Sequence, residues 1–238
     1  MTESDQHGLR RAVAEFLGTA LLLIAVIGSG IAAQRLSPGD AGLELLENAL
    51  ATGGALVAII LSLGPVSGAH LNPVITAVDW AFGGISSRLA GLYIATQTVG
   101  AVVGVMLANL MFSLPAVSIA TKERSSGGLW LSEVVATFGL VLVVFGLVRS
   151  GRGTAAPFAV GAYITGAYFF TSSTSFANPA VSIARTLSDT FAGISPASVP
   201  AFILAQLIGG AIGTVVIRLL YPNITAVASE AVVPHDAL

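Results

Sequence analysis

Apolar residues gather along this chain into six long runs that are separated by short polar segments. A helix that crosses a bilayer needs about 20 predominantly apolar residues, and each of the six runs is of that order. The predicted spans are about 12–34, 43–63, 87–112, 129–149, 155–172 and 199–221. The pattern therefore predicts an all-α membrane protein.

Two shorter apolar runs remain, at about 71–82 and 177–188. Each has roughly ten residues, which is half the thickness of a bilayer at about 1.5 Å per residue. Each begins at an Asn-Pro pair, Asn72-Pro73 in the first and Asn178-Pro179 in the second. Asn is a favoured helix cap and Pro suits the first helical turn. One such pair indicates only a helix start, whereas two at matching places predict a pair of half-helices.

The two halves of the chain resemble each other. Glu15 in "AEFLGTALLL" aligns with Glu133 in "SEVVATFGLVL", and "TQTVGAVVG" aligns without a gap with "AQLIGGAIG", matching Gln97 with Gln206. Each half contains three spans, an odd number, so the second half enters the membrane from the opposite face and forms an inverted repeat. The two half-helices then approach each other from opposite sides.

These boundaries predict a single domain over residues 1–238. Repeat 1 covers about 10–112 and repeat 2 about 128–221, and the ends 1–8 and 223–238 are expected to be flexible tails.

Composition agrees with a membrane protein and excludes several classes of function. The chain is 55% hydrophobic and 9% charged, against about 25% charged residues in soluble domains. Its net charge is −2 without a basic run, so we expect no nucleic-acid partner. Cysteine is absent, which excludes thiolate metal sites and cysteine nucleophiles. No phosphate loop, nucleophile triad or metal cluster is evident, so we expect no enzyme activity, no cofactor and no metal.

The basic residues predict the orientation of the bundle, because cytoplasmic loops carry an excess of Lys and Arg. One side of the membrane receives Arg10, Arg11, Arg88, Arg149, Arg152 and Arg218, and the other receives Arg35, Lys122 and Arg124 together with Asp40, Glu44, Glu47 and Glu123. Both termini are therefore expected in the cytoplasm.

Irregular backbone precedes each half-helix, as "GPVSGAH" and "TSSTSFA". At membrane depth such backbone is tolerated only where it is buried or lines a watery cavity. We therefore expect its carbonyl groups to line a pore with the amide donors of Asn72 and Asn178 at the centre. Two helix N-termini, each equivalent to about half a positive charge, would repel cations there and pass neutral hydrogen-bonding molecules. The expected carbonyls are those of Gly68, Ala69, His70, Thr174, Ser175 and Phe176.

With "SGAHLNPV" and "NPA" at paired positions and the duplicated Glu and Gln elements, the chain resembles the major intrinsic protein family of aquaporins and aquaglyceroporins over about 10–221. The resemblance implies an aquaporin-like inverted repeat of six transmembrane helices plus two re-entrant half-helices. It also implies a pore in every subunit of a homotetramer, within the lipid bilayer of the cell (inner) membrane. The implied pore centre consists of Asn72, Pro73, Val74, Asn178, Pro179 and Ala180. The first motif reads NPV instead of NPA, which should leave the Asn72 donor intact.

The resemblance further implies a selectivity filter of four residues. Counting without gaps from the two asparagines gives Thr52, Gly166, Ser175 and Val181. Water-selective members have an aromatic residue, a His and an Arg among these positions, whereas this chain has neither an aromatic residue nor a charge at any of them. The chain is thus similar to bacterial members with Val in place of the filter Arg. We expect a wider constriction without a fixed positive charge or its fork of donors.

Such a filter predicts a passive channel for small uncharged solutes. Water, glycerol and urea are included, and so are undissociated arsenite and methylated arsenicals, because bacterial members with Val in the Arg position are associated with arsenic handling. The alternative is a plain water and glycerol facilitator. A secondary transporter is less favoured, although inverted repeats with broken helices also occur in that class, because no coupling-ion ligands accompany Asn72 and Asn178.

Arg185 leaves two alternatives open. It follows Asn178 by seven residues, so at 3.6 residues per turn it returns to the helix face of Asn178 and Val181, roughly 6 Å beyond Val181. It is either a displaced arginine that faces the outer vestibule and repels cations, or a helix-end residue that binds loop carbonyls or Asp189.

Glu15 and Glu133 are acids inside apolar spans, where ionisable groups are costly and usually functional. As proton carriers they would indicate a transporter; as acceptors for loop N–H groups they would be braces. Their matching positions favour bracing, with Gln97 and Gln206 as further loop braces. His70 is either a pH sensor or a structural residue of the pore wall. The small-xxx-small patterns at Gly100, Gly104, Gly209 and Gly213 predict close helix crossings.

Overall fold

The computed structural model describes residues 3–222, and all regular elements in that range are helices. This confirms the predicted all-α membrane fold. The α-helices are α1 (Glu3–Leu36), α2 (Ala41–Ser67), α3 (Pro73–Phe82), α4 (Ser87–Met111), α5 (Gly127–Arg149), α6 (Ala156–Phe170), α7 (Pro179–Ala184) and α8 (Val199–Leu220). Short 3-10 turns occur at Gly153–Ala155, Arg185–Leu187 and Pro196–Ser198.

Each of the six predicted spans corresponds to one helix of the structure. Within the described residues, five helices are long and apolar enough to cross a membrane, namely α1, α2, α4, α5 and α8. The predicted fifth span at 155–172 is α6, a helix of 15 residues that extends for about 22 Å and directly follows the 3-10 turn Gly153–Ala155. The helix ends at Phe170, and the following residue, Thr171, has an extended backbone.

The flexible N-terminal tail at 1–8 stays a prediction, although part of it is helical. Helix α1 begins at Glu3, because adding residues to an existing helix is far easier than nucleating a new one. The predicted tail at 223–238 lies outside the described residues.

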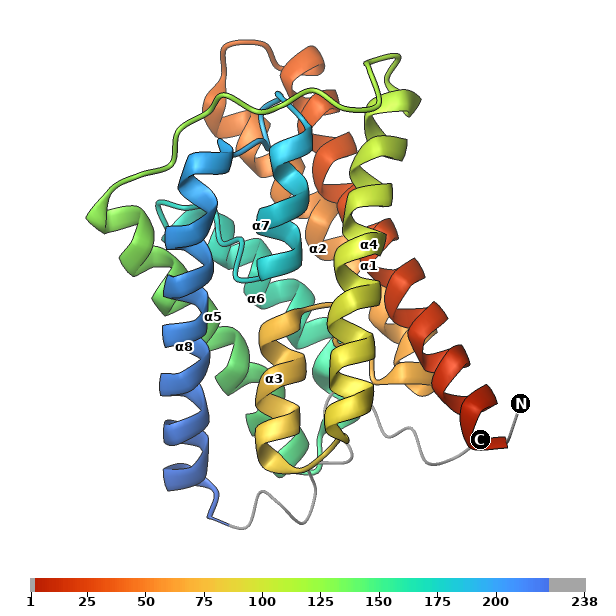
Figure 1. Ribbon diagram of the computed structural model, residues 1–238. Coiled ribbons are helices and arrows are strands. Elements are labelled where there is room, and N and C mark those ends of the chain that lie inside the picture. The colour runs from red at the N-terminus through yellow and green to blue at the C-terminus, as the bar shows by residue number, and fades with distance from the viewer. Residues whose placement is uncertain (1–2, 223–238) are drawn as a thin grey trace.

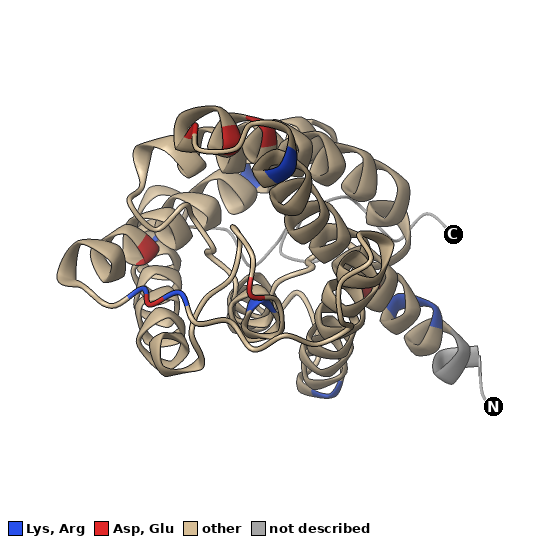
Figure 2. Ribbon diagram, turned by 90° about the horizontal axis from the view of Figure 1, so that it is seen from above, with Lys and Arg blue, Asp and Glu red and all other residues tan. Residues whose placement is uncertain are grey.

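The long helices surround the two half-helices (Figure 1). Helix α1 packs on α4, α5 packs on α8, and α2 packs on α6 across the two halves. Seen along the bundle, the helices form a ring, and the charged residues are confined to a few places on it (Figure 2).

Glycine brings the helices of each half into backbone contact. A Cβ atom at Gly100 would lie 2.3 Å from the Phe16 carbonyl oxygen, and one at Gly209 would lie 2.4 Å from the Val134 carbonyl oxygen. No larger residue fits at these distances. The two crossings occupy equivalent places in the repeat, α4 on α1 and α8 on α5.

Helices α3 and α7 enter the bundle from opposite ends, and their N-termini meet inside it (Figure 1). Each starts with Pro in its first turn after an Asn cap: the Asn72 side chain accepts a hydrogen bond from Val74 N, and the Asn178 side chain accepts from Ala180 N and Val181 N. Helix α3 ends at Gly83, whose φ of 85° favours glycine. Helix α7 has only six residues and continues as the 3-10 turn Arg185–Leu187.

Candidate functional site

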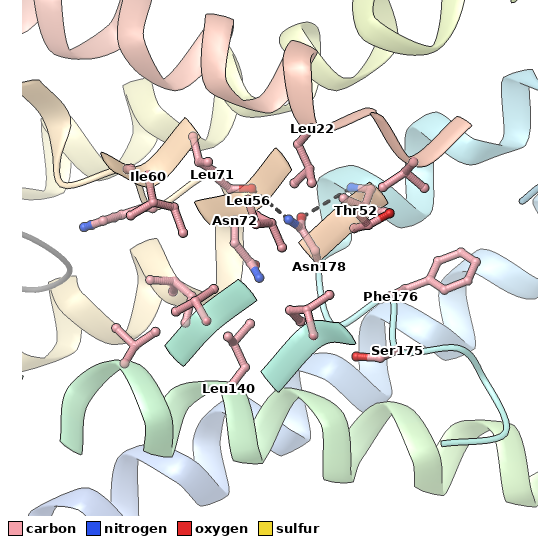
Figure 3. A pocket seen from close by; sticks show the side chains of 18 of the residues that line it. Leu22, Thr52, Leu56, Ile60, Leu71, Asn72, Leu140, Ser175, Phe176 and Asn178 are labelled. Carbon is pink, nitrogen blue, oxygen red and sulfur yellow. Dashed lines mark hydrogen bonds between the residues drawn. The ribbon is translucent and has the colours of Figure 1, made fainter. Parts of the chain in front are cut away.

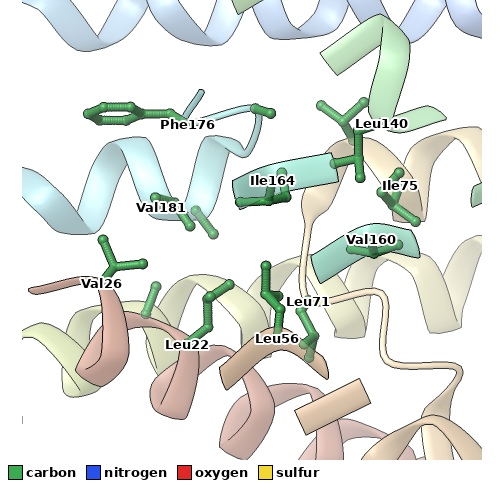
Figure 4. Close-up of a cluster of buried hydrophobic side chains, with 14 of the residues drawn as sticks. Leu22, Val26, Leu56, Leu71, Ile75, Leu140, Val160, Ile164, Phe176 and Val181 are labelled. Carbon is green, nitrogen blue, oxygen red and sulfur yellow. The ribbon is translucent and has the colours of Figure 1, made fainter. Parts of the chain in front are cut away.

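A narrow cavity lies where α3 and α7 begin (Figure 3). Its volume is about 60 Å³, about twice the roughly 30 Å³ that one water molecule occupies in the liquid. Most of its wall is hydrocarbon contributed by α1, α2, α5 and α6 (Figure 4). These side chains include Leu22, Val26, Leu56, Leu140, Val160 and Ile164. Any solute inside can therefore form hydrogen bonds at only a few places.

The two Asn-Pro motifs are joined by reciprocal hydrogen bonds. Asn72 Nδ2 donates to the Ala177 carbonyl oxygen at 2.7 Å, and Asn178 Nδ2 donates to the Leu71 carbonyl oxygen at 2.7 Å. Each asparagine also caps its own half-helix through Oδ1. An asparagine amide has two N–H donors, so one donor on each remains for the cavity that both residues line. Each half of the chain thus binds the backbone of the other.

The loops before the half-helices have a matching, strained backbone. Ala69 and Leu71 in the first loop have positive φ values of 46° and 51°, and Ser175 and Ala177 in the second have 50° and 48°. These residues stand three and one positions before each asparagine. The left-handed region costs roughly 1–2 kcal/mol per non-glycine residue, so other contacts must hold these loops in place.

Glu15 and Glu133 supply such contacts. The Glu15 carboxylate accepts hydrogen bonds from His70 N at 3.0 Å and Leu71 N at 2.7 Å. The Glu133 carboxylate accepts from Phe176 N and Ala177 N, both at 2.9 Å. Both acids are completely buried. Their bonds go to loop N–H groups, which is the geometry of a brace.

Each glutamine connects an acid to a half-helix. Gln97 Nε2 donates to Glu15 at 2.7 Å and to Thr76 Oγ1 at 3.0 Å. Gln206 Nε2 donates to Glu133 at 2.6 Å and to Ser182 Oγ at 2.9 Å. The same network therefore occurs twice, once in each half.

Three of the four expected filter residues line the cavity: Thr52, Ser175 and Val181. Gly166 does not; it is exposed on α6, whereas Val160, Ile164 and Tyr168 of the same helix line the cavity. Two residues along a helix correspond to a rotation of about 200°, so gapless counting selected the opposite face of α6.

Tyr168 adds an aromatic side chain to the cavity wall, whereas none of the four residues expected to form the filter is aromatic. Its side chain is buried, and its hydroxyl group lies 3.2 Å from Thr52 Oγ1, within hydrogen-bond distance. The sequence contained a signal for it, since Tyr168 continues the four-residue spacing of Val160 and Ile164. This helical spacing, unlike a count from Asn178, does not depend on the length of the loop that follows α6.

Arg185 also lines the cavity, so the wall carries a charge although none of the four expected filter residues does. Its guanidinium carbon lies 3.5 Å from the centre of the Phe176 ring, and its Nε donates to the Ala192 carbonyl oxygen. Within residues 3–222, no ion pair or hydrogen bond joins Arg185 to Asp189, whose carboxylate accepts hydrogen bonds from Thr121. Both alternatives for Arg185 thus hold in part: it binds a loop carbonyl and it faces the cavity.

Four of the six residues expected to supply pore carbonyls line the cavity: Ala69, His70, Ser175 and Phe176. Gly68 and Thr174 are not among its lining residues. The sequence interpretation missed Leu71 and Ala177, whose carbonyls accept the asparagine donors. His70 Nδ1 lies 3.1 Å from Thr76 Oγ1, and its Nε2 lies 3.6 Å from the Asp79 carboxylate.

The segment between α4 and α5 passes over the end of the bundle where α7 ends (Figure 1). Arg124 in this segment is buried and donates to the carbonyl oxygens of Gly193 and Ser173. Lys122 Nζ donates to the Phe191 carbonyl oxygen at 3.1 Å. Burial, together with the charges of Arg124 and Arg185, lowers the pKa of Lys122 to about 8. This mouth of the cavity is therefore rich in cations.

Comparison with known proteins places these features in context. The family model of the major intrinsic protein matches residues 2–176. The aquaglyceroporin AqpS of Rhizobium meliloti (strain 1021) is 47% identical over 211 residues, which cover 89% of this chain and 90% of that protein. The probable aquaporin NIP7-1 of Arabidopsis thaliana is 34% identical over 165 residues, covering 68% of this chain and 59% of that protein.

A solved structure has the same fold. The X-ray structure of the aquaglyceroporin from Plasmodium falciparum matches with a TM-score of 0.67 and 21% sequence identity, covering 92% of this chain and 99% of that one. At this identity the likeness concerns the fold alone.

Proposed function

Because the chain belongs to the major intrinsic protein family, whose members are channels and not enzymes, we propose that it conducts small uncharged solutes passively through the cavity at the Asn-Pro centre. The observation that carries this proposal is the reciprocal pair of hydrogen bonds from Asn72 and Asn178, which fixes two amide donors in a narrow, mostly apolar cavity. A solute that passes exchanges hydrogen bonds with water for hydrogen bonds with a few fixed groups. Ions lose more hydration than those groups replace.

The proposed substrates are water, glycerol- and urea-type solutes, and undissociated arsenite with its methylated relatives. All are small and neutral and carry oxygen or nitrogen atoms that form hydrogen bonds. Val181 and Ser175 support passage of solutes larger than water, because both are small residues in the outer half of the cavity. The relative from Rhizobium meliloti is named an aquaglyceroporin, which supports solutes of glycerol size.

A plain water and glycerol facilitator is the second candidate. Tyr168 and Arg185 favour it, because both line the cavity beside Val181 and occupy space that a wide filter would leave open. A secondary transporter has less support, since in the described residues no group of three or more metal-binding side chains is present and the buried acids Glu15 and Glu133 bind loop N–H groups.

The membrane location, the orientation and the assembly of the protein are also proposals. The distribution of Lys and Arg supports a cell (inner) membrane protein with both termini in the cytoplasm. Leucine, valine and phenylalanine side chains exposed on the outer faces of the long helices support contact with lipid and with other copies of the chain in a homotetramer.

Stopped-flow measurements in proteoliposomes test the proposal. Uptake of water, glycerol, urea and undissociated arsenite is compared for the wild type and V181R. A channel gives flux that increases linearly with solute concentration and does not depend on pH or membrane potential. V181R should reduce uptake of the three larger solutes more than that of water.

Two results would contradict the proposal. Saturating flux that is coupled to protons would indicate a transporter. Unchanged uptake of glycerol, urea and arsenite in V181R would remove position 181 from the constriction.

A further inference from the structure

Arg185 combines deep burial with access to the cavity. Its side chain is only 2% exposed, yet it lines the cavity together with Thr52, Tyr168 and Val181. We propose that the Arg185 guanidinium, stacked on Phe176, determines the specificity of the outer half of the cavity: it binds oxygen acceptors of neutral solutes and excludes cations. This inference rests on the proposed channel function. It adds a specificity-determining residue that lies outside both Asn-Pro motifs.

The position of the charge follows from helix geometry. Helical side chains lean toward the N-terminus of their helix, so the Arg185 side chain runs from the end of α7 back toward Val181, one turn earlier. Its guanidinium carbon lies 3.5 Å from the centre of the Phe176 ring. Phe176 stands two residues before Asn178 on the second loop. The charge is therefore close to the pore centre, although the Cα atom of Arg185 is a full turn further out.

The guanidinium is held rigidly. Its Nε donates to the Ala192 carbonyl oxygen. The Phe176 ring beneath it packs edge to face on Phe202 at 5.2 Å, and Phe176 N donates to Glu133. Arg124 lies on the same ring, with its guanidinium carbon 5.1 Å from the ring centre. A cation fixed in this way keeps one orientation toward a passing solute.

Most donors of the guanidinium remain for the cavity. Arginine has five N–H donors. Among the described residues, the Nε hydrogen bond to Ala192 is the single hydrogen bond of this side chain. The two terminal amino groups therefore supply up to four N–H donors to whatever occupies the cavity.

Other side chains of the cavity wall complete this site. The hydroxyl groups of Thr52 and Tyr168 lie within hydrogen-bond distance of each other, and Leu22 and Val26 add hydrocarbon to the lining. These residues suit neutral solutes that combine an oxygen acceptor with a small apolar surface.

The position of Arg185 also explains why a small residue, Val181, follows the second Asn-Pro motif. Positions 181 and 185 are four residues apart and share one helix face. A long side chain at position 181 would occupy the space through which the Arg185 side chain reaches the cavity, whereas valine leaves it open.

The test measures neutral flux and cation leak in the same proteoliposomes, using the full chain. Glycerol and urea uptake is followed by light scattering, and proton leak by an internal pH-sensitive dye under an imposed gradient. The variants are R185M, R185K and, as a matched control, R35M, which removes an exposed arginine at the same end of the bundle. A unit charge about 8 Å away at an effective dielectric constant of about 20 changes cation occupancy by roughly thirtyfold.

We expect R185M to raise proton leak by more than about tenfold while glycerol uptake persists. R185K, which keeps the charge but not the planar fork, should show a smaller increase, and R35M should behave like the wild type. A folded R185M channel with wild-type leak would overturn the inference while leaving the proposed function intact. Absence of glycerol and urea flux in the wild type would instead overturn the proposed function.

A second pair of variants covers the possibility that R185M does not fold. V181D places a carboxylate one turn before Arg185, where it neutralises the guanidinium without removing it, and V181N has nearly the same shape without the charge. V181D should leak protons more than V181N. Equal leak in the two variants would contradict a role for the Arg185 charge.

Discussion

The second loop depends on the carboxylate of Glu133, and E133Q changes that carboxylate without changing its shape. The two carboxylate oxygens accept three hydrogen bonds, from Phe176 N, Ala177 N and Gln206 Nε2. A glutamine side chain offers one acceptor oxygen and one NH2 group. With its oxygen at the position of Oε2, the glutamine keeps the hydrogen bonds from Ala177 N and Gln206 Nε2 as neutral ones, and Phe176 N faces the NH2 group.

The size of the effect follows from these contacts. Hydrogen bonds contribute about 1.5–3 kcal/mol each to a charged group and about 0.5–1.5 kcal/mol to a neutral one, so losing one and making the other two neutral costs about 3–6 kcal/mol. Removing a buried charge recovers part of that cost. We expect E133Q to lower the free energy of unfolding by roughly 3 kcal/mol. Solute flux should also fall, because the Ala177 carbonyl that accepts Asn72 belongs to the loop that loses its brace.

Tryptophan fluorescence during thermal unfolding of the detergent-solubilised protein measures the first effect, and stopped-flow glycerol uptake measures the second. E123Q is the matched control, since Glu123 is exposed in the segment between α4 and α5. E15Q provides a comparison within the chain: Glu15 accepts four hydrogen bonds, one more than Glu133, so its loss should be larger. Unfolding of E133Q within about 0.5 kcal/mol of the wild type would refute the bracing argument.

Three further predictions concern other parts of the molecule. G100A should destabilise the protein, because its Cβ atom would lie 2.3 Å from the Phe16 carbonyl oxygen. G91A should be neutral or slightly stabilising, because the space around Gly91 is open. Unfolding midpoints of the two variants distinguish these outcomes. The pKa of Lys122 is lowered from 10.5 to about 8. Between about pH 8 and pH 10.5 the unfolded chain therefore binds more protons than the folded protein, and the free energy of unfolding should rise with pH. K122Q should reduce that rise in a series of unfolding midpoints measured at different pH values. The cysteine-free chain should conduct regardless of mercurials, and S175C should become blocked by them, because Ser175 is buried and lines the cavity.

Features that depend on local rules or on the repeat were predictable from the sequence. The Asn caps and the Pro at the start of α3 and α7 follow from short-range helix chemistry. The pairing of Glu15 with Glu133 and of their glutamines was evident because the two halves align. The fold followed from the length and number of the apolar runs.

Features that depend on how distant segments meet were not predictable. Gly166 was assigned to the cavity by counting residues back from Asn178 without gaps across the loop that follows α6. The cavity-lining residue is Tyr168, two positions further on, so the count selected the opposite face of the helix. The contact between Phe176 and Arg185 joins a loop to the end of a half-helix, and no periodicity in the sequence encodes it. For the same reason, the sequence supported two alternatives for Arg185 where the structure combines them.

The reciprocal bonds between the Asn-Pro motifs also constrain how the protein is made. The Leu71 carbonyl receives its donor from Asn178, and the Asn72 amide finds its acceptor at Ala177. More than a hundred residues of synthesis separate the two loops. During synthesis, the first Asn-Pro motif therefore lacks its hydrogen-bond partners in the membrane. It acquires them only after α6 has been inserted and the second loop has been made. Completion of the pore is a late step of biogenesis, and truncation anywhere before residue 178 leaves the first motif without its partner.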